Sequence, residues 1–66
     1  MLISSQYDST TGYGRNFYVN ADMQNKKITF SVTIHGPKIY VQHEYSDFAE
    51  ACEQYNMLWA AVLAAA

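Results

Sequence analysis

The stretch KITFSVTIH, residues 27–35, decides the fold. A period of two in β-branched and aromatic residues is typical of a strand with one buried face and one solvated face. The stretch therefore predicts a half-buried β-strand. Its apolar and polar residues alternate strictly: Ile28, Phe30, Val32 and Ile34 against Thr29, Ser31, Thr33 and His35.

A second strand is predicted directly downstream. Gly36-Pro37 interrupts the alternation, and Lys38–Tyr45 is again extended in pattern. If the glycine and the proline are the two loop residues, the hairpin sets Phe30 opposite His43. Proline is unusual at the second position of such a loop, so a longer turn is the alternative.

A third strand is predicted upstream, over Arg15–Asp22. The four-residue turn Met23–Lys26 would join it to the central strand and set Val19 opposite Phe30. Both hairpins then share one apolar face, so the chain predicts a three-stranded antiparallel meander. The meander has four strands if Leu2–Tyr7 adds one at its start.

After Tyr45 the period of the sequence changes to that of a helix. Ser46 or Asp47 can cap this helix, and Asp47 with Glu50 has the spacing of a capping box. We expect a helix over about residues 47–64, packed on the apolar face of the meander in a single α+β domain of residues 1–66. Apolar residues recur every three and four positions: Phe48, Ala51, Cys52, Tyr55, Leu58 or Trp59, Val62 and Leu63.

The size of the chain limits its hydrophobic core. A chain of 66 residues is near the lower limit for burying a core unaided, although half of its residues are hydrophobic and ten are aromatic. Cys52 is the one cysteine, so no intrachain disulfide can form, and no Cys/His cluster indicates a zinc site. We expect no metal and no cofactor, and either very good packing or a homodimer to supplement the core.

Charge and hydropathy restrict the class of ligand and the cellular location that we expect for the protein. The net charge is −2, which is too small to indicate nucleic-acid binding. Met1–Ser5 lacks the basic and apolar regions of a signal peptide, and the apolar run Met57–Ala66 is too short to span a bilayer. These features, with a single cysteine, predict a cytoplasmic protein.

The hairpin at Gly36-Pro37 contains both histidines. In the predicted register, His35 lies on the polar face and His43 on the apolar face, and opposite faces cannot hold one metal ion. Glu44 shares the face of His35 but lies at the far end of its strand. A shared metal or acid–base site is therefore not expected. We interpret His43 as a partly buried, hydrogen-bonded residue near Phe30 at the edge of the core.

Two short motifs lack the context that catalysis or phosphate binding requires. Cys52 falls on the buried stripe of the helix, without the exposed and electropositive surroundings of a reactive thiol. GYGRNF, residues 12–17, lacks a third glycine and precedes a strand, so it does not fit a phosphate-binding loop. We interpret it as a flexible loop tip from which Tyr13 and Arg15 contact a partner.

The polar face of the predicted sheet carries tyrosines among Asn, Ser, Thr and Gln. This composition is typical of protein-binding surfaces, and ordinary solvated strands use the same residues. The aromatic platform of RNA-recognition modules is the further alternative, but the chain lacks their βαββαβ order and basic surface. The candidate partner-binding residues are Tyr18, Tyr40 and Gln42, with Tyr13 and Arg15 from the loop.

The last two turns of the predicted helix are apolar nearly all round and carry no charge. A helix of this kind usually packs on two sides, and the high helix propensity of alanine is the alternative explanation. Exposed apolar patches mark interfaces. The residues off the core stripe are therefore candidate dimer contacts: Met57, Ala60, Ala61 and Ala64.

The layout resembles that of known small inhibitors. A short meander, then one helix with an acidic start, in a chain without a catalytic constellation, resembles the single-domain proteins that phages and mobile elements make against host proteins, anti-CRISPR proteins included. EYSDFAEACEQYN, residues 44–56, is similar to the strand-to-helix junction of HicB-like antitoxins. Neither resemblance assigns a role to an individual residue.

These features together predict a small, non-enzymatic protein-binding module. The resemblance implies a phage-encoded inhibitor that occludes a surface of a host or defence protein. One alternative is a homodimeric accessory module joined through the apolar end of the helix. The other is a weak binder of RNA or single-stranded DNA that uses Tyr18 and Tyr40.

Overall fold

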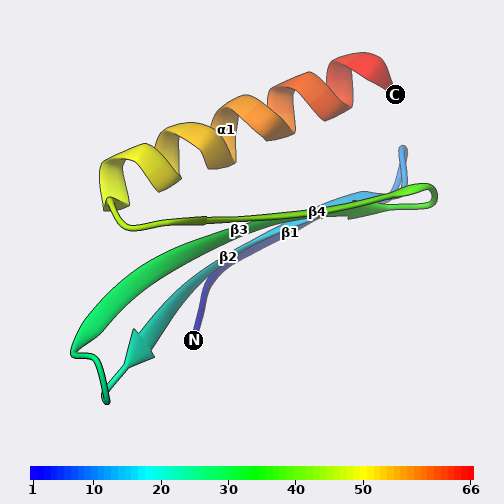
Figure 1. Cartoon of the computed structure of the whole chain (residues 1–66). Helices are drawn as coiled ribbons and strands as arrows, with labels where there is room; N and C mark the ends of the chain where they lie inside the picture. The colour runs from blue at the N-terminus through cyan, green and yellow to red at the C-terminus, as the bar shows by residue number, and fades with distance from the viewer.

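In the computed structural model, which describes residues 1–66, four strands precede one helix. The strands form a single antiparallel sheet in the order β1-β2-β3-β4, and α1 lies across one face of it (Figure 1). The predicted α+β meander with a C-terminal helix is confirmed, in its four-stranded form. The elements are β1 (Leu2–Asp8), β2 (Tyr13–Asp22), β3 (Lys27–Gly36), β4 (Ile39–Tyr45) and α1 (Phe48–Ala65).

The β2–β3 hairpin has the predicted register, with Val19 opposite Phe30. Its turn is organised by Asp22, whose carboxylate accepts hydrogen bonds from the backbone N–H groups of Gln24 and Asn25 at 3.1 and 3.2 Å. The side-chain amide of Asn25 donates a third bond, at 2.7 Å. This amide bond, followed by the backbone bond from the same residue, lowers the pKa of the Asp22 carboxyl.

The β3–β4 hairpin is shifted by two residues from the predicted register. Phe30 lies opposite Tyr45, not His43, because Gly36 pairs with Ile39 and the loop is Pro37-Lys38. The ring of proline fixes φ near −65°, which suits the first loop position of a turn better than the second. A shift of two residues leaves every side chain on its predicted face, because strand side chains alternate with a period of two.

Strand β1 explains why β2 begins two residues earlier than expected. Asp8 pairs with Tyr13 across the first turn, and the N–H of Gly12 donates to the carbonyl of Asp8 at 2.8 Å. The pairing then runs regularly to Ser4, where one extra residue, Ile3, forms a β-bulge. The first strand is therefore an edge strand that is irregular only at its start.

The helix begins at Phe48, one residue later than predicted, and Asp47 is its N-cap. The carboxylate of Asp47 accepts a hydrogen bond of 2.8 Å from the N–H of Glu50, as the capping-box spacing suggested. The helix lies over β2, β3 and β4 and reaches β1 only through long side chains. It does not have the length and apolar character that would let it cross a membrane.

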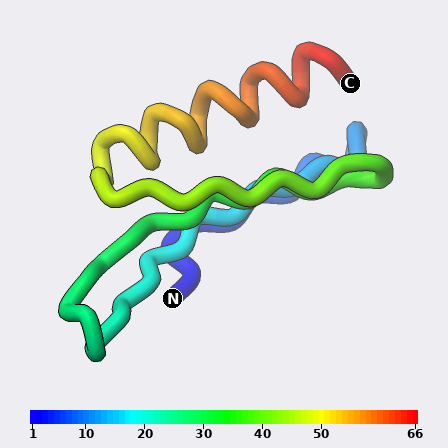
Figure 2. The backbone as a smooth tube through the Cα atoms, in the orientation of Figure 1, coloured from blue at the N-terminus to red at the C-terminus, as the bar shows by residue number.

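The core is small and centres on Phe17, which is 3% exposed. The rings of Tyr55, Phe48 and Phe30 approach it edge-on, with centroids at 5.2, 6.0 and 6.2 Å. The β2–β3 hairpin continues beyond the start of α1 and ends in a turn far from the helix (Figure 2), so its tip adds nothing to this core. The buried hydrophobic residues are Phe17, Val32, Ile34, Ala51, Tyr55 and Trp59.

Candidate functional site

The sheet face opposite α1, called the open face below, has a floor of small residues. Ser31 and Thr33 are only 3% and 4% exposed although no helix covers them. Gly14, on the neighbouring strand, is also buried. The cover comes from larger residues directly across from this floor: Tyr18 and Glu44 beside Ser31, and Asn16 and Gln42 beside Thr33.

Side-chain hydrogen bonds hold the open face in place. The amide of Asn20 donates to the hydroxyl of Ser31 at 2.6 Å. The hydroxyl of Ser5 donates to the amide oxygen of Asn16 at 2.8 Å. One bond joins β1 to β2 and the other joins β2 to β3, so these four side chains are already oriented before any partner binds. Preorganised groups lose less entropy on binding.

One row of the open face crosses all four strands: Tyr7, Gly14, His35 and Tyr40. The ring of His35 fills the space above Gly14, where a Cβ atom would overlap it. Tyr7 and Tyr40 stand at the two ends of the row and are 65% and 68% exposed. Three strand spacings separate them, about 14 Å. The row therefore presents two phenol rings on either side of a flat centre.

The predicted contact residues of the strands lie on this face. Tyr18, Tyr40 and Gln42 are on the open face, and the hydroxyl of Tyr40 donates to the side-chain oxygen of Gln42 at 3.3 Å. The register shift places Tyr40 in the row of His35, two residues further from Tyr18 than expected. Tyr7 was not predicted, because the sequence alone left the pairing of β1 open.

Tyr13 and Arg15 lie on the other face of the sheet. Both belong to β2, so their assignment to a flexible loop tip is wrong. The ring of Tyr13 covers Gly36, the residue after the His35 that pairs with Gly14. Arg15 extends beneath the helix. Neither residue shares a surface with Tyr18, and a partner on the open face would not contact them.

Arg15 is held from both sides by neutral acceptors. Its Nε and Nη2 donate to Oε1 of Gln6 at 3.1 and 2.8 Å. Its Nη1 donates to the carbonyl of Tyr55 and to Oδ1 of Asn56, each at 3.2 Å. The guanidinium carbon also lies 4.0 Å from the centre of the Tyr55 ring and 5.2 Å from that of Trp59. The residue therefore links β1, β2 and α1.

The two histidines lie on opposite faces, as the alternation predicted. His35 is on the open face, and His43 is on the helix-facing side, opposite Val32. His43 is exposed, with its ring 6.4 Å from that of Tyr45, so the interpretation as a partly buried residue near Phe30 is wrong. No group of three or more His, Cys, Asp or Glu side chains gathers where it could hold a metal ion.

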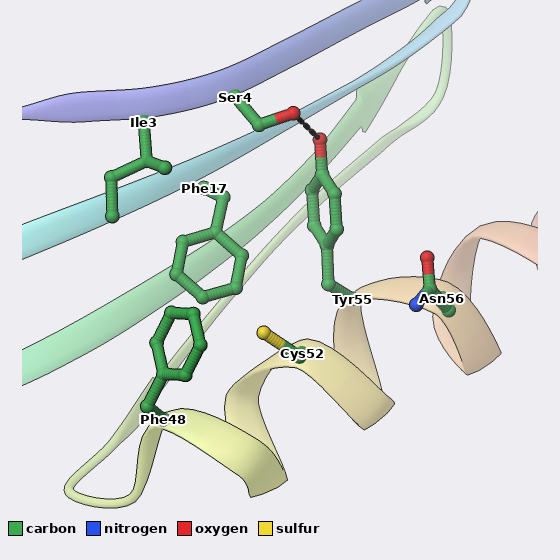
Figure 3. Close-up of a pocket in the computed structure, with 7 residues that line it drawn as sticks. All are labelled: Ile3, Ser4, Phe17, Phe48, Cys52, Tyr55 and Asn56. Atoms are coloured by element: carbon green, nitrogen blue, oxygen red, sulfur yellow. Dashed lines mark hydrogen bonds between the residues drawn. The ribbon is translucent and has the colours of Figure 1, made fainter.

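A shallow groove lies between β1 and α1 on the helix-facing side (Figure 3). Its volume is about 170 Å³ and its lining is mostly apolar. Ser4 and Tyr55 share a hydrogen bond of 3.1 Å across it. Cys52 is half-buried: it packs against the core, as its place on the buried stripe predicted, and it also lines this groove. The apolar lining consists of Ile3, Phe17, Phe48, Cys52 and Tyr55.

The far side of α1 carries the predicted dimer contacts. Met57 is 55% exposed, and Ala60, Ala61 and Ala64 are exposed as well. These four residues lie off the core stripe, as their spacing predicted. They form a surface of small side chains with one larger one.

No family model, no curated protein and no solved structure matches this chain.

Proposed function

We propose that this chain is a non-enzymatic protein-binding module that uses the open face as its contact surface. The observation that carries the proposal is the row with Tyr7 and Tyr40 at its ends, on a face whose small residues Gly14, Ser31 and Thr33 are already buried. Tyrosine and side-chain amides on a rigid, flat support are typical of protein-binding surfaces. The small residues of the floor are already buried. A partner would therefore bury mainly the exposed tyrosine rings, which have a large apolar area and a hydroxyl group for hydrogen bonding.

The charges of the open face favour a protein partner over nucleic acid. The row of Tyr7 and the row next to it, which runs through Ser5, Asn16, Thr33 and Gln42, contain no Lys, Arg, Asp or Glu. Nucleic-acid binding depends on basic side chains that neutralise phosphates. These two rows, which end before the row of Ser31 and Glu44, carry hydroxyl and amide groups and instead match a polar, uncharged protein surface.

Inhibition by occlusion is the activity that we assign to this module. A flat, preorganised face can cover a functional surface of its partner without a change of shape in either protein. The resemblance to small phage inhibitors supports this mode of action, with a host or defence protein as the partner. In this mode the two phenol rings act as anchor residues and the amides fix the orientation.

The test is affinity capture from host extract with the tagged wild-type chain and two variants. The first variant is Tyr7→Ser with Tyr40→Ser, and the matched control is Met57→Ser, which alters another large side chain that is more than half exposed, on the far side of α1. Loss of two anchor tyrosines at about 1.5 kcal/mol each should weaken partner binding by about 100-fold or more. The control should bind like wild type.

Thermal unfolding of the three proteins shows whether the variants are folded. All three side chains are more than half exposed, so each substitution should change the free energy of unfolding by no more than about 0.5 kcal/mol. Capture that survives in the double variant would remove the open face from consideration. Capture that disappears after nuclease treatment would instead support the nucleic-acid alternative.

A further inference from the structure

The open face contains a polar pocket beyond the two neutral rows. Its volume is about 330 Å³, near the lower end of the range for ligand sites, so it has room for one long side chain. Most ligand sites are lined mainly by apolar groups, whereas this lining is almost entirely polar. Its polar residues are Asn20, Asp22, Asn25, Lys27, Thr29 and Glu44.

The pocket forms where the sheet narrows to two strands. Asn20 and Thr29 lie opposite each other, and at their level neither β1 nor β4 is paired with the β2–β3 hairpin. The hairpin continues alone from this point (Figure 2). Glu44 and Lys27 have longer side chains and line the two ends of the pocket, so the surface is lower between them.

The charges at the outer end of the pocket are already balanced. Asp22 and Lys27 lie directly opposite each other on β2 and β3, and opposite charges in such positions attract. The carboxylate of Asp22 also accepts three hydrogen bonds within the turn, from Gln24 and Asn25. Neither charged side chain at this end lacks a partner.

Glu44, at the inner end, is different. It is exposed, lies opposite Ser31, and its carboxylate accepts no hydrogen bond and forms no ion pair. Every aspartate of the chain, by contrast, accepts a hydrogen bond from a backbone N–H group. The other two glutamates, Glu50 and Glu53, belong to α1 and line no pocket. Glu44 is therefore the one carboxylate that lines a pocket and has no partner.

A second acceptor is held in place next to Glu44. The side-chain amide of Asn20 donates to the hydroxyl of Ser31 at 2.6 Å, which fixes the amide and leaves its oxygen free to accept. Thr29, opposite Asn20, adds a hydroxyl group. The pocket thus combines a negative acceptor, an oriented amide oxygen and a hydroxyl in one concave site.

We infer that this pocket receives an arginine side chain of the protein partner, with the guanidinium group against the carboxylate of Glu44. The inference rests on the proposed function, since it takes a protein to be the partner of the open face. A guanidinium group has five donors in one plane, no acceptor and weak hydration, so it matches several acceptors in a pocket open to water. The ammonium group of lysine is compact and strongly hydrated, and fits such a site less well.

The donor set does not suit a metal ion. Calcium takes six to eight oxygen ligands, with carboxylates prominent among them. The two carboxylates of this pocket stand at its opposite ends, and that of Asp22 is already hydrogen-bonded. One cationic side chain at Glu44 satisfies the unpaired charge without a change elsewhere in the pocket.

The position of the pocket specifies the pattern that the partner presents. The row of Tyr7 and Tyr40 crosses β3 at His35, and the row of Glu44 crosses it at Ser31. Four residues of a strand separate the two rows, about 13 Å. The partner should therefore present its arginine about 13 Å from the surface that the two phenol rings contact.

Nuclear magnetic resonance titration of the isotope-labelled chain with N-acetyl-arginine methylamide, at constant ionic strength, tests the inference without the partner. The backbone amide of Thr29 and the side-chain amide of Asn20 should shift and saturate, with a dissociation constant on the order of 10 mM. The lysine analogue has the same charge and should bind at least about threefold more weakly. Glu44→Gln should raise the dissociation constant at least about tenfold. Glu53→Gln removes the same charge from an exposed position of α1 and should leave it unchanged.

Three results of the titration would overturn the inference: no saturable shift at the pocket, equal binding of the lysine analogue, or equal weakening by the two glutamine substitutions. In the capture assay, Glu44→Gln should weaken partner binding about tenfold, and unchanged capture would also overturn it. Failure of the proposed function is a separate result. It appears as capture that survives Tyr7→Ser with Tyr40→Ser, whatever the titration shows.

Discussion

Replacing Arg15 by alanine tests whether this residue stabilises the fold or contacts a partner. In the structure its guanidinium joins the amide of Gln6 on β1 to the carbonyl of Tyr55 and the amide of Asn56 on α1. The helix does not otherwise pack on β1, so this side chain and the Ser4–Tyr55 bond are the polar links between the two elements. Arg15→Ala removes the larger of these links.

The expected loss of stability follows from the contacts. Four hydrogen bonds at a partly exposed site contribute about 0.5 kcal/mol each, and stacking on Tyr55 adds about 0.5–1 kcal/mol. Ordering the long side chain opposes this by about 1 kcal/mol. The variant should therefore lose about 2 kcal/mol of a total that is about 3–10 kcal/mol for a chain of this length, and its Tm should fall by roughly 8–16 °C.

Urea unfolding followed by circular dichroism measures this loss as a lower midpoint with an unchanged m-value. Two variants sharpen the result. Arg15→Lys keeps the charge but not the planar fork, so it should recover less than half of the loss. Gln6→Ala should cost about 1 kcal/mol alone and much less when Arg15 is already alanine, since the two residues share their bonds.

The effect should be the same at low and high salt, because the guanidinium has no carboxylate partner. An Arg15→Ala variant within about 0.5 kcal/mol of wild type would refute the assignment to a structural link. Full recovery by Arg15→Lys would show that charge matters and that the geometry of the fork does not.

Substitutions at two further positions test the start of the helix and the pH dependence of the fold. Asp47→Ala removes the cap on Glu50 and should lower the free energy of unfolding by about 1 kcal/mol, whereas Asp47→Ser should retain most of it; equal losses in both would argue against capping. Burial, and secondarily the charge of Glu50, raises the pKa of Tyr45 above its usual 10.0, so its neutral form is favoured in the folded state. Stability from this residue is complete below pH 10 and declines as the pH rises further, because the unfolded chain then releases the proton more readily. Tyr45→Phe should show a shallower decline in alkaline urea titrations, and identical slopes would contradict the assignment.

Local patterns were sufficient for the elements and their faces. The alternation through β3 placed Val32 and Ile34 in the core and His35 on the open face. The β2–β3 register followed from the length of one turn, and the capping residues located the start of α1 within one residue. These signals are short-range: each depends on residues within one turn or one strand pair.

Other properties depended on contacts between segments that are distant in the sequence. The tyrosine row requires β1 to pair with β2 from Asp8 onward, and the neutral stretch LISSQY carries no local pattern strong enough to show this. The sequence also did not predict the position of Arg15 between β1 and α1, because its hydrogen-bond acceptors are 9, 40 and 41 residues away in the chain. In the sequence alone, a basic residue after two glycines is typical of an exposed loop. Its structural role is seen only when α1 is packed above it.

The sequence by itself determined which residues alternate, where the helix starts and which side of each strand is apolar, because these follow from backbone periodicity and local hydrogen bonding. Only the tertiary structure decided how far α1 extends over the sheet. The helix covers three strands and leaves β1 uncovered, since its buried stripe of Ala51, Tyr55 and Trp59 is too narrow for four. That choice produces the free edge and the groove beside it, and it leaves the opposite face of the sheet, with Tyr7 and Tyr40, open to a partner.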